Sequence, residues 1–226
     1  ETETVDKLFC MFDEHLENKG LISHKGTIVD ATFVDAPRQR NSRDENKKIK
    51  NGVIPEEWEK PENKSKLAQK DIDADWTKKN GERHFGYKDH VKCDADSKLI
   101  TNYSVTSASV HDSQRCLVFI GQEDEVLYAD SAYSGKPIAL ALPENCKNQI
   151  CEKGYRNSPL TSEQKMNNRR KSRIRCRIEH IFGFMTGAMH GITIRSIGIT
   201  RAWMNIGITN LVYNFCRYSY LKRASA

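Results

Sequence analysis

Apolar residues recur along the chain with two different spacings, one typical of β-strands and one typical of α-helices. Strand-like runs lie at residues 27–34, 84–93, 99–107 and 126–129, with a weaker run at 148–152. Turn-prone residues separate the second and third runs, which predicts a hairpin and, with the first run, an antiparallel meander. A helical segment precedes the fourth run, and a strand–helix–strand connection favours parallel pairing.

Helical spacing accounts for most of the remaining apolar positions. The predicted helices span residues 5–16, about 112–120, 135–142, about 161–185 and about 200–220. A capping-box pattern from Thr161 to Gln164 begins the fourth of them. We expect the last helix to pack beneath the sheet. These patterns together predict an α/β fold in which a mixed five-stranded sheet is flanked by helices.

The stretch from residue 38 to residue 80 departs from both spacings, because Lys, Glu, Asp, Asn and Arg dominate it. It predicts a long charged insertion after the first strand. One interpretation is a solvated loop with partial disorder, since few apolar side chains are available for a core. The other is an excursion that contacts DNA or a partner, with Trp58 and Trp76 as its anchors.

Positive charge is concentrated in one segment of the chain. The formal net charge of the 226 residues is only +6, yet six basic residues fall within nine positions: Arg169, Arg170, Lys171, Arg173, Arg175 and Arg177. A solvated helix face would explain such a cluster, and so would a polyanionic partner such as DNA or RNA.

Cysteine usage and hydropathy bear on the compartment. Seven cysteines form no CxxC pair, so we expect buried free thiols and a reducing, intracellular environment. No apolar run approaches the roughly 18 residues of a membrane span, and we expect no membrane partner.

Three acidic residues stand in unusual surroundings. Asp30 lies within one apolar strand-like run, Asp130 ends another, and Glu179 follows the arginine cluster. A carboxylate among apolar residues is costly to ionise unless a cation or a hydrogen-bond donor compensates it. If the fold brings the three together, they would suit hard divalent metal ions. Two such ions can activate a hydroxyl and stabilise the leaving oxygen in phosphodiester chemistry.

Five segments, taken in order, carry a family resemblance: Ile28–Thr32, Gly86–Lys88, Val110–Ser113, Tyr128–Tyr133 and Arg175–Gly183, with a similar tail at Asn210–Asn214. They resemble the DDE transposases of the bacterial IS5 group, within the wider IS4-like superfamily, over nearly the whole chain. The resemblance implies an RNase H-like fold in which Asp30, Asp130 and Glu179 are the catalytic acids. They would bind two Mg²⁺ or Mn²⁺ ions.

The same resemblance bears on the residues around Glu179. In the superfamily's Tyr-Arg-Glu-Lys signature the Arg falls on Arg175, while the Tyr and Lys positions hold Ser172 and Thr186. Two signature roles are therefore absent or supplied elsewhere. We expect contacts to the DNA backbone from Arg173, Arg175, Arg177 and His180. Arg175 is the arginine of the signature, whereas the other three are chosen by their charge and helical neighbourhood rather than by a motif. His111 and Asp112 match a family pattern, and we interpret them as structural residues or as residues that support the site without touching its ligands.

The resemblance also predicts the organisation and activity of the chain. Relatives usually carry a further N-terminal region, so residues 1–25 would be its remnant and residues 26–226 the RNase H-like catalytic domain. The predicted function is metal-dependent cleavage and strand transfer at transposon ends. Synapsis of two ends predicts a homodimer on double-stranded DNA, in the bacterial cytoplasm and associated with the nucleoid. The alternatives are a catalytically silent DNA-binding derivative, or a nuclease that cleaves without joining.

Overall fold

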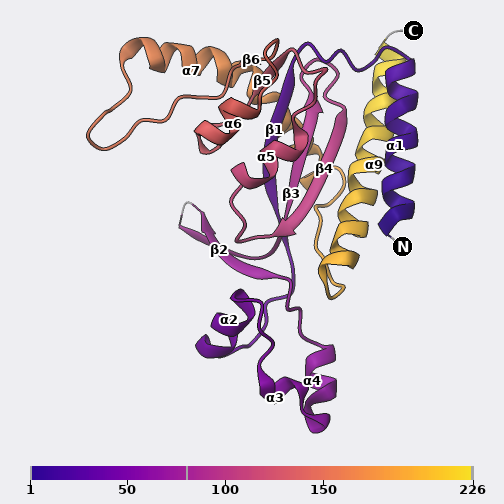
Figure 1. Ribbon diagram of the computed structural model, residues 1–226. Helices are drawn as coiled ribbons and strands as arrows, with labels where there is room; N and C mark the ends of the chain where they lie inside the picture. The colour runs from indigo at the N-terminus through magenta and orange to yellow at the C-terminus, as the bar shows by residue number, and fades with distance from the viewer. Residues whose placement is uncertain (1, 80, 225–226) are drawn as a thin grey trace.

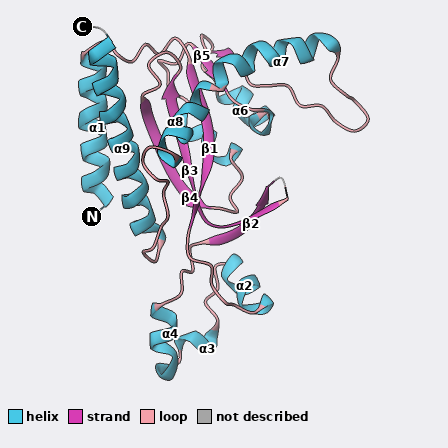
Figure 2. Ribbon diagram, turned by 180° about the vertical axis from the view of Figure 1, so that it is seen from behind, coloured by secondary structure: helices cyan, strands magenta, loops and turns pink. Residues whose placement is uncertain are grey.

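The computed structural model describes residues 2–79 and 81–224, and it places a mixed β-sheet between two layers of helices. In Figure 1, α5 (Ser113–Phe119) and α6 (Lys136–Ala141) cover one face of the sheet. Figure 2, seen from behind, shows α8 (Arg177–Thr186) over the other face. The long helices α1 (Thr2–Asn18) and α9 (Ile199–Ala224) lie side by side and share a core with α8. None of the described helices combines the length and the apolar character needed to cross a membrane.

β1 (Thr27–Asp35) lies in the middle of the sheet, antiparallel to β3 (Glu82–Asp94) and parallel to β5 (Val126–Tyr128). The antiparallel β4 (Ile100–Ser107) extends the sheet beyond β3, and the short β6 (Lys147–Asn148) extends it beyond β5. The predicted meander and the parallel crossover are therefore confirmed. This mixed sheet, with helices on both faces, is the architecture expected of the RNase H-like fold.

The sheet has six strands where five were predicted, because the end of the charged stretch joins it. β2 (Asp75–Lys79) pairs with the first residues of β3 and β4 pairs with the rest, so both lie on the same edge of β3. Gly86 marks the change between the two partners. Its φ is 146°, and a side chain there would meet the carbonyl oxygen of Val34. Glycine is the residue that tolerates both the conformation and the close approach.

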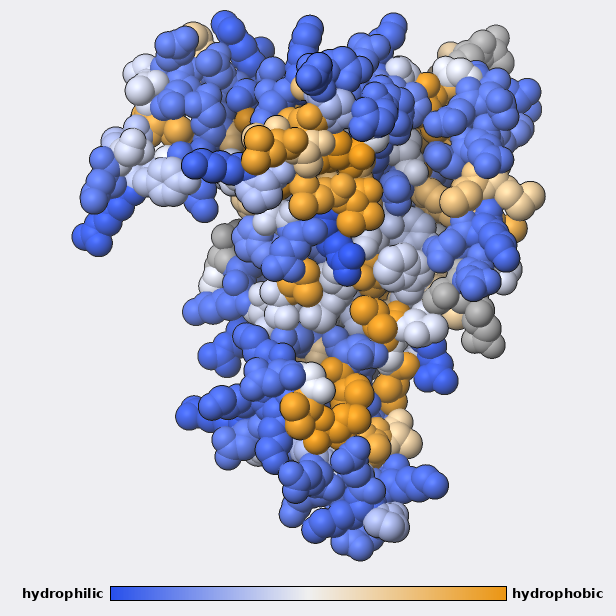
Figure 3. Space-filling model, viewed as in Figure 1, coloured by the Kyte–Doolittle hydropathy of each residue, from blue (hydrophilic) through white to orange (hydrophobic). Residues whose placement is uncertain are grey.

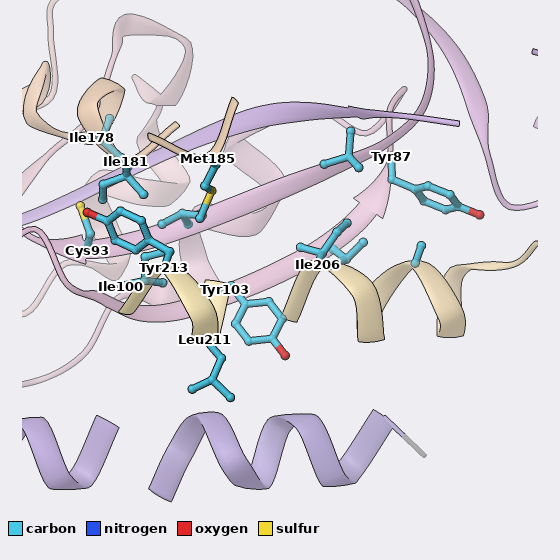
Figure 4. Close-up of a cluster of buried hydrophobic side chains, with 14 of the residues drawn as sticks. Tyr87, Cys93, Ile100, Tyr103, Ile178, Ile181, Met185, Ile206, Leu211 and Tyr213 are labelled. Carbon is cyan, nitrogen blue, oxygen red and sulfur yellow. The ribbon is translucent and has the colours of Figure 1, made fainter. Parts of the chain in front are cut away.

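Alternation along β1 sends its side chains into two separate cores. Ile28 belongs to the core formed with α8 and α9, whereas Val29 belongs to the core formed with α5 and α6. Figure 4 shows Ile178 and Ile181 of α8 in the first of these cores. Because successive strand residues point to opposite faces, Asp30 points to the same side as Ile28, toward α8.

The prediction of one continuous helix over about 161–185 is wrong. The predicted capping box begins α7 (Ser162–Arg175), but this helix ends at Cys176, where α8 follows. α7 buries none of its residues, and its Asn168 side chain pairs with both backbone groups of Glu152, at 2.9 and 3.0 Å. In contrast, α8 buries apolar side chains against the sheet. The helix is interrupted where a segment anchored to a loop meets a segment anchored to the sheet.

The charged stretch after β1 is folded over much of its length. It contains α2 (Arg43–Lys50), α3 (Glu56–Glu59), the 3₁₀ helix η1 (Pro61–Asn63) and α4 (Lys64–Ala68). We call residues 41–70 the inserted lobe; it projects from one end of the sheet in Figure 1. The interpretation as a solvated loop is wrong for these helices.

Trp58 holds the inserted lobe together. Its side chain is 0% exposed, and its indole Nε1 donates to Oε1 of Glu45 at 2.8 Å. The ammonium groups of Lys66 and Lys70 lie 5.3 and 5.2 Å from the centre of the ring. A buried Trp58 cannot anchor a partner at the surface, so that part of the second interpretation is wrong. Trp76 is half-buried against Phe85, with the ring centres 5.1 Å apart.

Polar contacts fix the two terminal helices on the sheet. Oδ1 of Asp6 in α1 accepts from the Tyr103 hydroxyl at 2.6 Å and from Trp203 Nε1 at 2.9 Å. The buried Asn214 side chain of α9 pairs with both backbone groups of Ile100, at 2.9 and 2.7 Å. The last helix therefore packs on the sheet as expected. The division of the chain at residue 25 stays a prediction.

Candidate active site

Asp30 and Asp130 come from neighbouring parallel strands. The register of β1 and β5 pairs Thr27 with Leu127 and Ile28 with Tyr128. Continued by two residues, this register places Asp130 level with Asp30, at the end of β5 where the chain leaves the sheet. There Asp130 caps the 3₁₀ helix η2 (Ser131–Tyr133), its Oδ1 accepting from the Ala132 N–H at 2.6 Å. The sheet therefore holds the two carboxylates side by side, one in the middle of β1 and one just beyond the end of β5.

Arg175 connects the third acid to the first. It is the last residue of α7, and Glu179 lies in the first turn of α8. Nη1 of Arg175 lies 2.8 Å from Oδ2 of Asp30, and its Nη2 lies 2.9 Å from Oε1 of Glu179. The guanidinium also interacts electrostatically with Asp130. One cation thus draws together the three acids that the sequence singles out.

The electrostatics of Asp30 reflect its position inside the sheet. Burial raises the pKa of its carboxyl to about 6, and the negative charge of Asp130 acts in the same direction. The N–H of Ala31, which donates to Oδ1 at 2.8 Å, and the charge of Arg175 both oppose this rise. The pKa of Arg175 is raised despite its burial, because Asp30, Glu179 and Asp130 favour its charged form. Asp30 therefore depends on a nearby cation to stay ionised.

The donor set suits a hard divalent cation. All three side chains offer carboxylate oxygens, which Mg²⁺ prefers in proteins. In the described chain, Oδ2 of Asp130 and Oε2 of Glu179 accept no hydrogen bond, whereas Arg175 occupies the other Glu179 oxygen and Oδ2 of Asp30. The residues fit a metal by chemistry, and a cation bound between Asp30 and Glu179 would have to displace the guanidinium.

A second acidic cluster competes with this site on geometry alone. Oxygens of Glu123 and Asp124 and a ring nitrogen of His24 all lie within 4.8 Å of one another. The ammonium of Lys92, however, lies 2.9 Å from Asp124 and 3.5 Å from Glu123, and the Thr27 hydroxyl donates to Asp124 at 2.6 Å. Lys92 already pairs with both acids of this cluster, so we assign the cluster a structural role.

The structure treats the four predicted DNA-contacting residues differently. Arg175 is turned toward the acids, and Arg177 donates to the Ala95 carbonyl at 2.7 Å and pairs with Asp96 at 2.9 Å. Arg173 and His180 are exposed. The contacts of these four residues with DNA stay predictions, and for Arg175 and Arg177 they would require an exchange of partners.

The sequence analysis missed the pairing of two motif segments. Nζ of Lys88 lies 2.7 Å from Oδ1 of Asp112 and donates to the Val110 carbonyl at 2.7 Å. This pair lies on the α5 side of the sheet, because Lys88 directly follows Tyr87 in β3 and Tyr87 points to the other face, into the core with α8. The presence of both segments in one family pattern was the available signal. The pair links Asp112 to β3, and its structural or supporting role stays a prediction.

Comparisons with known proteins identify relatives over most of the chain. Residues 22–215 match the model of a family described as the transposase DDE domain. A transposase for insertion sequence element IS1106 from Neisseria meningitidis serogroup B is 30% identical over 190 residues, which are 80% of this chain and 61% of that relative. The chain thus spans less than two thirds of the relative's length.

Among solved structures, the piggyBac transposase synaptic complex with hairpin DNA, determined by cryo-EM, is similar with a TM-score of 0.44 and 9% sequence identity. The similarity covers 87% of this chain and 48% of the piggyBac chain.

Proposed function

Because the chain belongs to the transposase DDE domain family, we propose that it is the catalytic domain of a DNA transposase, with Asp30, Asp130 and Glu179 as its metal-binding acids. The proposed reaction is phosphodiester cleavage at transposon ends followed by strand transfer. The observation that carries this proposal is the guanidinium of Arg175, 2.8 Å from Asp30 and 2.9 Å from Glu179 and under the charge of Asp130. Three acids from distant parts of the sequence share one cation.

Each acid is held in a way that suits its proposed role. Asp30 is fixed in the middle strand of the sheet, and the cap of η2 fixes Asp130 beside it. Glu179 is exposed at the start of α8, and its Oε2, which Arg175 does not occupy, can bind a cation from the solvent side. Two bound Mg²⁺ or Mn²⁺ ions would activate the attacking hydroxyl and stabilise the leaving oxygen.

Arg175 has a second part in the proposal. A cation bound by Asp30 and Glu179 would release its guanidinium at the position where the DNA must approach the acids. Guanidinium groups bind phosphate oxygens with two parallel hydrogen bonds. Arg175 would then position the DNA backbone, in line with its place in the family signature. The chain is proposed to act as a homodimer, since two transposon ends must be brought together.

Nicking of supercoiled plasmid DNA in Mn²⁺ tests the catalytic role of the acids. We expect the wild-type chain to nick the plasmid, and Asp130→Asn and Glu179→Gln to lower the rate at least 100-fold, since each removes a metal ligand. Glu163→Gln is the matched control, because this acid is exposed on α7 away from the three carboxylates. Full activity in either acid variant would refute the assignment.

The alternative of a silent DNA-binding derivative has its own outcome in the same experiment. It rests on Ser172 and Thr186, which replace signature residues. Thr186 donates to the Phe182 carbonyl of its own helix at 2.9 Å, so it leaves the lost lysine role unfilled. Salt-sensitive DNA binding without nicking in Mn²⁺ or Mg²⁺ would favour this alternative. Product analysis separates a transposase from a nuclease that does not join the ends.

A further inference from the structure

A basic cleft of about 610 Å³ lies where the inserted lobe meets the sheet. Three segments line it: residues 36–39 after β1, residues 65–71 around α4, and residues 195–197 before α9. Four of its side chains are cationic, namely Arg38, Lys66, Lys70 and Arg195, and one is acidic, Asp71. The cleft therefore carries an excess of positive charge.

The single acid of the cleft is already engaged. Both carboxylate oxygens of Asp71 accept from the Tyr87 hydroxyl, at 2.8 and 2.7 Å, and Oδ1 also accepts from the backbone of Asp73 and Ala74. Asp71 is only 4% exposed. These donors satisfy the carboxylate inside the protein, so it does not neutralise the cations at the surface of the cleft.

Three of the four cations have no acidic partner in the described part of the chain. Lys70 donates to the Arg40 carbonyl at 3.0 Å and to Oδ1 of Asn41 at 2.6 Å, which are both neutral. Arg38 is exposed and lies 5.8 Å from the centre of the Trp76 ring. Arg195 is exposed as well. Lys66 is the exception, since it lies 3.4 Å from Glu45.

A second hollow of about 450 Å³ adjoins the cleft and shares Gln39 with it. Its lining combines the ring of Trp76 with polar and basic side chains, among them Asn41, Lys78 and Arg83. The exposed Arg43 and Lys50 lie three residues before and four residues after Asn46 in α2, on the same side of the helix. Figure 3 shows hydrophilic side chains around a hydrophobic patch on the visible face of the inserted lobe. Basic residues therefore continue from the cleft onto α2, which also carries the acidic Asp44 and Glu45 in its first turn.

We propose that this cleft binds the phosphodiester backbone of double-stranded DNA, at a distance from the carboxylates. The inference builds on the proposed function, but the binding it describes needs neither metal nor cleavage. An open, polar groove with several unneutralised cations suits a chain of phosphates better than a small ligand, which requires enclosure. The inserted lobe would then clamp DNA against the end of the sheet.

The geometry of β1 sets the distance between the two sites. Asp30 lies on β1, and the cleft begins at Ala36, six residues further along the chain. At about 3.3 Å per strand residue this separation is roughly 20 Å, the length of about six base pairs. DNA held by the cleft would therefore be contacted about half a helical turn or more from the bond beside the acids.

Equilibrium binding of a duplex of about 30 base pairs in EDTA, measured by fluorescence anisotropy across a salt series, tests this proposal. We expect Arg38→Gln/Lys70→Gln/Arg195→Gln to bind at least tenfold more weakly than the wild type at about 100 mM salt. The slope of log Kobs against log salt should fall in magnitude by about 2 to 3, at roughly 0.9 per lost phosphate contact. The matched control is Lys19→Gln/Lys222→Gln/Arg223→Gln, which should bind like the wild type. These residues lie at the C-terminal ends of α1 and α9, far from the inserted lobe.

The double variant Arg38→Gln/Arg195→Gln covers the case in which the loss of Lys70 unfolds the lobe, because both arginines are exposed. It should lower the slope by about 2. An unchanged slope in this variant, or an equal loss in the control, overturns the proposal. A poly-glutamate peptide that binds the wild type and not the variant, with DNA binding unaltered, would reassign the cleft to an acidic protein partner. The binding experiment contains no metal, so the cleft can bind DNA even if the chain does not nick it. Equally, the chain can nick DNA even if the cleft variants bind DNA like the wild type.

Discussion

At the scale of single residues, Arg175 shows how a buried carboxylate stays charged. Its guanidinium lies 2.8 Å from Asp30, whose pKa burial raises to about 6. A divalent ion at the same place would carry twice the charge and would take over this stabilisation. Arg175 thus stabilises the charged form of Asp30 in the folded chain before any metal is bound. This arrangement also explains why an arginine stands one helical turn before Glu179.

Asp89 is a second buried acid, and it has no cation beside it. Its side chain is 0% exposed, and Oδ1 accepts from Nδ2 of Asn210 at 3.1 Å. Burial raises the pKa of Asp89 to about 8. Oδ2 of Asp89 and Oδ1 of Asn210 are both buried acceptors without a partner. A proton on Oδ2 would supply a donor for that unpartnered pair, so the neutral carboxyl is the form that fits the core.

Asp89→Asn should therefore change how stability depends on pH. The folded state binds the Asp89 proton more tightly than the unfolded chain, whose pKa is about 3.9, so this group's stabilisation is complete below pH ~4 and is lost as the pH rises toward 8. Between these values the wild type should lose about 1.4 kcal/mol per pH unit relative to the variant. Thermal unfolding from pH 5 to pH 8 measures the difference.

The exposed Asp35→Asn serves as the control for the pH series, since it should leave the pH profile unchanged. A constant difference between Asp89→Asn and the wild type across the range would show that Asp89 is ionised in the folded core.

At the scale of elements, residue spacing predicted those helices and strands whose formation depends on neighbouring residues in the sequence. The alternation of β1 and the hairpin of β3 and β4 followed from residue spacing, and so did the capping box of α7. The break at Cys176 did not, because it depends on which loop or strand each half of the helix contacts. The inserted lobe was missed for a related reason. Its cohesion comes from Trp58, whose partners Glu45 and Lys66 lie outside any helical window.

Trp58→Ala should unfold the inserted lobe and leave the sheet intact. The substitution removes the only fully buried large side chain of the lobe's described residues, at a cost of about 3–5 kcal/mol. Hydrogen exchange followed by mass spectrometry should show lost protection over α2–α4 and unchanged protection in β1 and β3. Trp58→Phe keeps a packed ring but loses the hydrogen bond to Glu45. Its protection over α2–α4 should fall between that of the wild type and that of Trp58→Ala.

Loss of protection throughout the chain in Trp58→Ala would mean that the lobe and the sheet fold as one unit. Unchanged protection in α2 would mean that Trp58 does not hold the lobe.

At the scale of the whole molecule, β1 connects two places with opposite charge. The carboxylates gather beside its middle, and the basic cleft opens just beyond its end. The sequence allowed us to predict that Asp30 and Asp130 lie close together, since it predicted that their strands pair in parallel. The cleft could not be foreseen, because its three lining segments are far apart in the sequence and meet only through the lobe and the start of α9.

The most direct test of this account is a Mn²⁺ titration of the metal-free chain near pH 7.5, with free Mn²⁺ measured by electron paramagnetic resonance. We predict that the wild type binds up to about two ions and that Asp30→Asn and Asp130→Asn lose this binding. Glu123→Gln, in the cluster that pairs with Lys92, should bind Mn²⁺ as the wild type does. Binding that survives in both aspartate variants, or that disappears in Glu123→Gln, would contradict the assignment of the three acids as the metal site.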